Sequence, residues 1–278
     1  MDKQNNQQEL NKTKASYAVN QKPKGSVRTK ISIALLGLLI LSMISATFAW
    51  FTISEFSSVN NMNISIGSGV QLFISGEDHG ADITLYSKEL TNEDINAQLA
   101  EGVSLDDFVL FPVTSTNGRE MYTQSGDLKA ANSNSYLEFT AYLISTESMW
   151  VHLTSEDTEI GANNGTKVAT TDTGVRADIV KCTRVSFTDA ESNKTVIYEP
   201  GKTNGADVAG QTTFDLPSPM KLSDSTRVCY LEKMTPKKVV IRIWIDGEDP
   251  ECDDDVQLSN LQVRLNFRGT DENNVPVN

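Results

Sequence analysis

Cysteine is scarce in this chain, and its spacing excludes two common uses of the residue. The 278 residues include three cysteines, Cys182, Cys229 and Cys252, and no Cys-x-x-Cys pair. The chain therefore lacks the motifs of a zinc ribbon and of a thioredoxin-like protein, and it has too few cysteines for a disulfide scaffold. Two interpretations stay open: one bridge with one free thiol, or three buried thiols that pack as small hydrophobic groups.

Catalytic motifs are also missing. The two histidines, His79 and His152, stand far apart and form no His-Glu-x-x-His pair. The chain contains no Gly-x-Ser-x-Gly, P-loop or Gly-x-Gly-x-x-Gly sequence. We expect both histidines at the surface or at an interface. The sequence therefore predicts that the protein is not an enzyme and has no catalytic residue, metal site or cofactor.

The start of the chain differs in net charge from the remainder. The formal net charge is -13, but residues 1–30 carry seven Lys or Arg against two acids, which leaves +5 there and -18 in the remainder. An acidic part of this size repels the phosphates of nucleic acids, so we expect no nucleic-acid partner. Residues 1–30 are almost free of apolar side chains and are predicted to be a disordered basic leader.

One long apolar run follows this leader. Residues 31–53 contain no charged side chain. A helix over residues 31–50 would span about 30 Å, which is the thickness of the hydrocarbon core of a bilayer. The basic residues before the run and the acidic sequence after it place the leader in the cytosol and the large remaining part outside.

The end of the apolar run has the features of a signal-peptide cleavage site. Thr47 and Ala49 are small residues at positions −3 and −1 of a cut between Ala49 and Trp50. This pattern predicts removal by a signal peptidase. The alternative is a permanent anchor, because the run is longer than the usual core of a signal peptide.

The same segment resembles a known family of export signals. The apolar residues 35–44 and the Ala-Thr-Phe-Ala-Trp-Phe-Thr sequence of residues 46–52 resemble signals handled by the SipW type of signal peptidase in Gram-positive bacteria. Proteins with such signals belong to the TasA and camelysin family. The resemblance implies a β-sandwich of jelly-roll type that assembles into fibres of the biofilm matrix through donated N-terminal strands. The long leader and the cysteines distinguish this chain from typical members and favour a divergent relative.

Alternation of apolar and polar residues dominates the exported part. It is clearest in residues 261–268, 239–246 and 137–143. Weaker alternation marks further candidate strands at residues 62–66, 70–75, 150–154, 177–188, 195–198 and 227–234. Nine or ten such strands with almost no helix predict an all-β fold, an antiparallel β-sandwich of jelly-roll type.

One helix and a simple domain plan complete the expected fold. Residues 91–100 are predicted to be helical, with Thr91 as the cap and Asp94 three residues later. The predicted plan is a leader (1–30), a signal helix (31–49), an exposed segment (50–60) and one sandwich domain (61–278), with an inserted region around residues 76–130.

The densest polar cluster lies between the two clearest strands. Residues 246–255 hold seven carboxylates in ten positions. We expect a solvated hairpin loop here. A calcium site is the alternative, because calcium binds six to eight oxygen ligands from a flexible loop, although the spacing is not that of an EF-hand.

The segment after the predicted cleavage site is the main candidate for function. Its apolar and β-branched content suits a strand that pairs with an open sheet edge of a neighbouring copy. The predicted donor strand consists of Trp50, Phe51, Thr52, Ile53, Ser54, Glu55 and Phe56. The alternative is the exit of an uncleaved membrane helix, with Trp50 and Phe51 as interfacial anchors.

Three functions stay open. The predicted one is a secreted or cell-surface matrix subunit whose partners are other copies of itself, the signal peptidase and, through residues 31–50 before cleavage, the membrane. The second is a membrane-anchored module that binds a carbohydrate, peptide or cation through Tyr136, Tyr142 and Trp244. The third is a secreted peptidase, which the camelysin resemblance alone suggests.

Overall fold

The chain divides into two units, Met1–Ser54 and Glu55–Asn278. The computed structural model describes parts of the second unit: residues 57–67, 71–155, 165–202, 213–216, 221–253, 256 and 259–277. The predicted leader, signal helix, cleavage site and donor strand lie outside the described residues. Among the helices that are described, none is both long enough and apolar enough to cross a bilayer.

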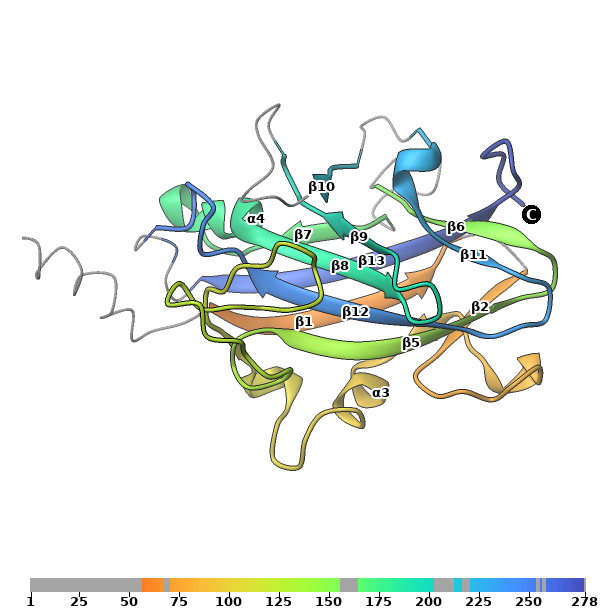
Figure 1. The fold of residues 1–278 in the computed structure, drawn as a ribbon, viewed down its shortest axis with the longest axis horizontal. Coiled ribbons are helices and arrows are strands. Elements are labelled where there is room, and N and C mark those ends of the chain that lie inside the picture. Colours follow the sequence, from red (N-terminus) through yellow and green to blue (C-terminus); the bar gives the residue numbers. More distant parts are fainter. Residues whose placement is uncertain are drawn as a thin grey trace, which may run out of the picture. The chain divides into compact units, whose positions relative to one another are not determined.

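The described residues form an all-β fold of two sheets (Figure 1). Sheet A has the order β11 (Arg227–Leu231), β6 (Met149–Leu153), β13 (Asn260–Thr270), β1 (Ser57–Ile66) and β3 (Glu89–Leu90), with β4 (Val109–Leu110) on β1 and β7 (Lys167–Ala169) on β13. Sheet B has the order β10 (Thr213–Phe214), β9 (Thr195–Tyr198), β8 (Thr183–Asp189), β12 (Lys237–Ile245), β5 (Leu137–Ser145) and β2 (Leu72–Ser75).

The predicted alternation is confirmed where it was clearest. In β13 the apolar side chains of Leu261, Val263, Leu265 and Phe267 are all buried in the main core. The core lies between the sheets, and the ring of Phe267 meets that of Phe187 from β8 edge to face, with centroids 5.8 Å apart. Packing of the two sheets through these faces supplies the main hydrophobic stabilisation of the fold.

The expectation of purely antiparallel sheets is wrong. β1 pairs with β13 in parallel, and β10 pairs with β9 in parallel. Parallel neighbours need a long connection between them. For β1 and β13 that connection is the rest of the domain, because the first described strand lies beside the last one. Alternation within a strand does not reveal such a pairing.

The predicted strand at residues 177–188 is also partly wrong. Residues before Thr183 form η3 (Gly174–Asp178) and α4 (Ile179–Cys182), and β8 begins only at Thr183. Ile179 and Cys182 are both buried. Their spacing of three residues fits one face of a helix and not one face of a strand.

The predicted helix after residue 90 is confirmed but shorter. The helix α3 (Asn92–Asn96) is capped by Thr91, whose side chain accepts a hydrogen bond from Asp94 N. The Asp94 carboxylate in turn accepts one from Thr91 N at 2.8 Å. This reciprocal pair is a capping box. The single-turn helices η1 (Ile83–Leu85), η2 (Leu105–Asp107) and η5 (Asp224–Thr226) complete the fold. Since β3 and β4 both pair with β1, residues 76–130 contribute directly to sheet A.

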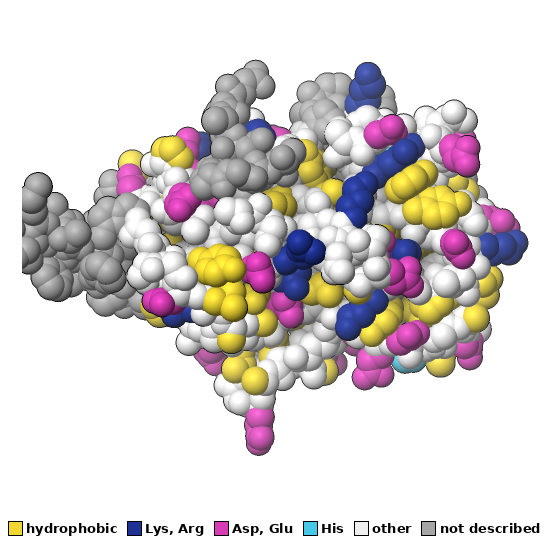
Figure 2. All heavy atoms as spheres, in the orientation of Figure 1, with side chains coloured by type: hydrophobic (Ala, Val, Ile, Leu, Met, Phe, Trp, Pro, Cys, Tyr) yellow, Lys and Arg dark blue, Asp and Glu magenta, His cyan; other side chains and the backbone are white. Residues whose placement is uncertain are grey.

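Charges of both signs are distributed over the visible surface. On the face shown in Figure 2, acidic and basic side chains are interspersed with apolar ones and do not form one large patch of a single charge. The outer face of sheet B is partly covered by residues 113–131, which form a small second core with Trp244 and Tyr136.

Candidate assembly surface and buried polar sites

β1 is the described strand that follows the predicted donor segment. Its ladder with β13 runs from Ser58 opposite Asn260 to Ile66 opposite Phe267, with an irregularity between Val59 and Asn61. Asn260 is the first residue of β13, so the ladder cannot extend past Ser58 toward the N-terminus of β1. Residues 50–56 precede this first rung in the sequence.

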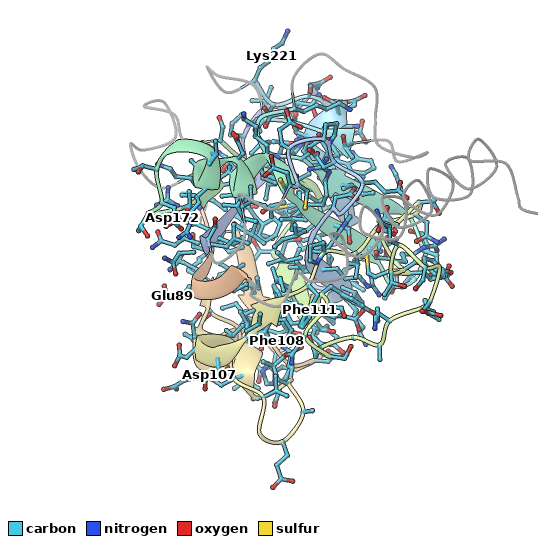
Figure 3. All side chains as sticks on the ribbon, turned by 90° about the vertical axis from the view of Figure 1, so that its left-hand side faces the viewer. Glu89, Asp107, Phe108, Phe111, Asp172 and Lys221 are labelled. Carbon is cyan, nitrogen blue, oxygen red and sulfur yellow. The ribbon has the colours of Figure 1, made fainter. Side chains whose placement is uncertain are left out.

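The other side of β1 is covered by short pairings. β4 pairs with Ser57 and Ser58, and β3 pairs with Ile64 and Ser65. Between these pairings Val59 N donates to Phe108 O at 3.2 Å. Figure 3 shows Glu89 from β3 and Phe108 just before β4 on the side of the molecule seen there. The first strand is therefore held by one long parallel ladder and by two short antiparallel ones.

The outer edge of β5 is closed by two side-chain amides. β2 covers β5 only from Tyr142 to Ser145. Beyond it, Thr140 N donates to Gln98 Oε1 at 2.7 Å and Gln98 Nε2 donates to Thr140 O at 2.9 Å. Asn132 makes the same pair of bonds with Glu138, at 2.7 and 2.9 Å. Each amide imitates one rung of a strand, and together they block an edge that could otherwise pair with another chain.

The outermost strand of sheet A carries an exposed aromatic side chain. Tyr230 on β11 is 37% exposed, and its ring lies 5.0 Å from that of Trp150 on β6. Arg227 stacks over the Trp150 ring at 4.5 Å, and its Nη2 donates to Glu272 O at 2.8 Å. Among the described residues, β11 pairs along its length with β6.

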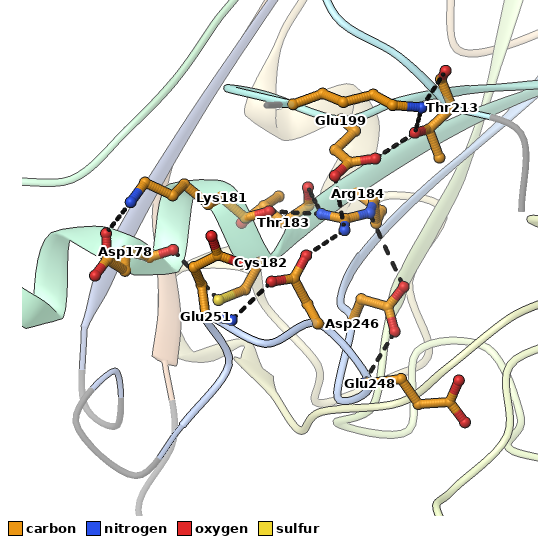
Figure 4. A network of polar contacts seen from close by, with 12 residues as sticks. Asp178, Lys181, Cys182, Thr183, Arg184, Glu199, Thr213, Asp246, Glu248 and Glu251 are labelled. Atoms are coloured by element: carbon orange, nitrogen blue, oxygen red, sulfur yellow. Dashed lines mark hydrogen bonds and ion pairs between the residues drawn. The ribbon is translucent and has the colours of Figure 1, made fainter. Parts of the chain in front are cut away.

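A buried arginine organises the acidic segment between β12 and β13 (Figure 4). Arg184 on β8 is fully buried. Its Nη2 lies 3.1 Å from Glu199 Oε1 and also binds Asp249, and its Nε lies 3.9 Å from Asp246 Oδ2. Its Nη1 donates to Lys181 O at 2.5 Å. Burial of one cation among three carboxylates strengthens each interaction, because the local dielectric constant is low.

The expectation of a solvated hairpin loop at residues 246–255 is therefore wrong for the hairpin and for Asp246 and Asp249, whereas Glu248 and Asp253 are exposed. The segment joins β12 in sheet B to β13 in sheet A and is not a hairpin. Asp246 and Asp249 are buried, since Arg184 neutralises them. A hydrogen bond with Asp249, followed by burial, raises the pKa of Glu251.

Arg184 was not among the residues that the sequence suggested. The sequence did contain a hint of its role. Arg184 lies in a segment of alternating apolar and polar residues, and the densest run of carboxylates in the chain had no assigned cation. The calcium alternative gains no support, because the described residues contain no group of His, Cys, Asp or Glu arranged to hold a metal ion. Asp254 and Asp255 lie outside the described residues.

The expectation for His152 is wrong, because this side chain is fully buried. Its Nδ1 lies 2.9 Å from Thr226 Oγ1 and its Nε2 lies 2.8 Å from Thr270 Oγ1. Burial, with a further contribution from the nearby charge of Arg227, lowers the pKa of His152 to about 4. The imidazole is therefore neutral at pH 7 and links the hydroxyl groups of two elements.

His79 lies elsewhere, in the loop after β2. It is half-buried, and its ring meets that of Tyr86 edge to face at 5.4 Å. It lines a cavity of about 510 Å³ together with Glu77, Glu89 and Asp94. The Asp94 carboxylate is already engaged in the cap of α3.

Two of the three aromatic residues proposed as ligand contacts are inaccessible. Trp244 is fully buried and Tyr136 is 5% exposed, because residues 113–131 cover this part of sheet B. Tyr142 alone of the three stays partly exposed. The polar face of a strand is therefore not a reliable guide to exposure where a long loop folds over it.

Comparisons with known proteins gave no relative: no family model, no curated protein and no solved structure matches the chain. The resemblance of residues 35–52 to the export signals of the TasA and camelysin family therefore stays a prediction.

Proposed function

We propose that this chain is an exported structural subunit of a cell surface or extracellular matrix, and that copies of it associate by donation of the N-terminal strand. In this proposal residues 50–56 become the start of the mature chain after cleavage between Ala49 and Trp50. They then pair with a sheet edge of the next copy.

The observation that carries the proposal is the register of β1. Its parallel ladder with β13 begins at Ser58 opposite Asn260, the first residue of β13. In sequence, the predicted donor residues precede this rung and are separated from it by Ser57, which pairs with Leu110 of β4. The strand β13 has no residue before Asn260 with which they could pair. Since a strand given to the next copy makes a head-to-tail contact that does not close, repeated donation builds an open filament.

The arrangement of sheet edges favours β11 as the acceptor. On β5 the exposed edge is occupied by the amides of Gln98 and Asn132. On β2, Ile74 exchanges two backbone hydrogen bonds of 2.9 Å with Ser87. Among the described strands that end the two sheets, β11 is the longest, and it presents the exposed ring of Tyr230.

We also propose the jelly roll as the finer description of the fold. Two packed sheets and strands whose sheet neighbours are distant in sequence support it. Strand topology in an experimental structure, with residues 156–164 and 203–212 traced, is the measurement that checks it. A sandwich without jelly-roll connections would contradict it.

The test of strand donation is negative-stain microscopy of the exported chain from a Gram-positive host. Ile53→Pro removes a backbone donor and restricts φ, so it prevents regular strand pairing. Ile53→Val is the matched control. We expect filaments from the parent and Ile53→Val, and dispersed particles from Ile53→Pro with unchanged circular dichroism. Equally abundant filaments from Ile53→Pro, or none from the parent, would contradict the proposal.

A second candidate function is a membrane-anchored binding module, which the exposed Tyr230 ring beside the half-buried Trp150 favours. An exposed aromatic ring suits the apolar face of a sugar. N-terminal sequencing of the protein from the host distinguishes the two candidates. A chain that begins at Trp50 supports strand donation, whereas a chain that retains residues 1–49 supports the anchored module.

A further inference from the structure

Two of the three cysteines meet at the end of sheet B where β8 begins. All three are free thiols; Cys182, at the end of α4, is fully buried, and Cys252 is half-buried in the segment after β12. The Cys182 Sγ donates to Asp178 O at 3.3 Å. The Cys252 side chain is a neighbour of this thiol, and the interaction between the two side chains, followed by burial, raises the pKa of Cys182. Cys252 packs against the main core cluster, which contains Cys182.

Backbone and ion-pair contacts hold the two cysteines in this position. Asp246 N donates to Cys182 O at 2.8 Å, which fixes the start of the segment against α4. Arg184, two residues after Cys182, binds Asp249, and Cys252 N donates to Asp249 O at 2.9 Å. Figure 4 shows Cys182 among the polar residues of this network. Three separate contacts thus hold the segment that carries Cys252 against the residues around Cys182.

We propose that Cys182 and Cys252 are a disulfide-forming pair and become bonded when the folded chain meets a disulfide oxidant. Neighbouring thiols on segments held together in this way need only a local displacement to reach the S–S bond length of about 2 Å. Disulfides persist in oxidising surroundings outside the cytosol. Formation of this bond in the cell therefore rests on the proposed function, because that function includes export. The ability of the two thiols to form the bond in the purified chain does not depend on export.

The oxidant is a small-molecule disulfide or a thiol–disulfide oxidoreductase, written RSSR. The half-exposed Cys252 thiolate attacks one sulfur of RSSR, forms a mixed disulfide and releases RS⁻. The sulfur of Cys182 then attacks the Cys252 sulfur, its proton passes to solvent, and a second RS⁻ leaves. After protonation the products are one protein disulfide and two RSH, so the protein loses two electrons and RSSR gains them.

The bond would join parts of the fold that serve different sheets. Cys182 directly precedes β8 in sheet B, and Cys252 lies on the connection that leads to β13 in sheet A. The first residue of β13, Asn260, pairs with Ser58 near the start of β1. A bond that restrains the connection to β13 therefore stabilises the end of the sandwich at which β1 begins. Cys229 takes no part: it is buried on β11, and burial raises its pKa to about 12.

The test uses the full-length chain, purified in mild detergent and reduced, and then exposed in its folded state to oxidised glutathione. Free thiols are blocked, the chain is cut with trypsin, and the peptides are weighed. We expect residues 182–184 joined to residues 243–264, and the thiol count to fall from three to one, the remaining thiol being Cys229. Cys252→Ser, at a half-exposed position, should abolish the linked peptide while the chain stays folded.

Three outcomes would overturn the inference. They are three blocked thiols after oxidation, a stable glutathione adduct on Cys252, or a bridge that includes Cys229. None of these readouts depends on filaments or export. Failure of this test therefore leaves strand donation standing, and absence of filaments leaves the disulfide standing.

Discussion

At the scale of single residues, Arg184 determines how the acidic segment folds. The guanidinium group is fully buried and has three carboxylates within 4 Å. Removal of one member of a buried ion pair leaves the other charge without a partner in a medium of low dielectric constant. Asp246 and Asp249 can therefore stay buried as carboxylates because Arg184 neutralises their charge.

We expect Arg184→Met to lower the free energy of unfolding by about 3–5 kcal/mol, because two carboxylates stay buried without their cation. Urea unfolding at pH 7 measures the change. The exposed Arg176→Met is the matched control and should change stability by less than about 0.5 kcal/mol. Asp249→Asn should cost less in a chain that already carries Arg184→Met than in the parent. An Arg184→Met chain as stable as the control would refute this account of the segment.

The lowered pKa of the buried His152 predicts that the stability of the fold depends on pH. Its pKa is about 4 in the folded chain against an ordinary value of 6.5. The unfolded chain therefore binds the extra proton between these values, and the folded state loses stability as the pH falls from 6.5 to 4. The loss is at most about 3 kcal/mol. Urea unfolding from pH 7 to pH 4 should show a shallower decline for His152→Gln than for the parent, and identical slopes would contradict the assignment.

At the scale of elements, the edge of β5 shows how a sheet end is protected without another strand. The amides of Gln98 and Asn132 each satisfy one N–H and one C=O of β5. Asn132 adopts a φ of 57°, a conformation that asparagine tolerates better than most residues. The two amides come from separate loops, so the protection depends on the fold of residues 76–135.

Gln98→Leu should destabilise the chain by about 1–3 kcal/mol, because Thr140 loses partners for both of its backbone groups. It should also increase self-association, since an edge of β5 becomes available for pairing. Urea unfolding and light scattering measure the two effects in chains that also carry Ile53→Pro, because the proposal expects filaments from chains without that substitution. The exposed Gln124→Leu, which removes an amide outside this edge, should change neither. A monodisperse Gln98→Leu chain would exclude the protective role.

The sequence located the strands well and their neighbours poorly, for a physical reason. Every second side chain of β5, β12 and β13 enters the core, so alternation reports which segments are strands. It does not report which strands lie side by side, and the parallel pair of β1 and β13 was therefore missed. Arg184 and His152 were missed because burial of a polar side chain depends on contacts with distant elements. Residues 50–56 were proposed from composition and resemblance, and they lie outside the described residues.

At the scale of the whole molecule, the proposal joins an exported acidic chain to a fold whose first described strand lies beside its last. The parallel ladder of β1 places the start of the described chain at the end of the sandwich where β13 begins. In the proposal, residues 50–56 pair with a second copy while β1 keeps its own ladder with β13. In the same proposal, the net charge of -18 after residue 30 opposes association of copies except through a specific contact.

The contact between copies is the central claim, and photo-crosslinking tests it most directly. A photoreactive phenylalanine analogue replaces Phe51 in an equal mixture of ¹⁵N-labelled and unlabelled exported chains, which are irradiated after assembly. We expect linked peptides of mixed isotope content in which residue 51 is joined to β11 or to its neighbour β6. Linked peptides of a single isotope content only would show that the segment stays with its own chain, and strand donation would then be wrong.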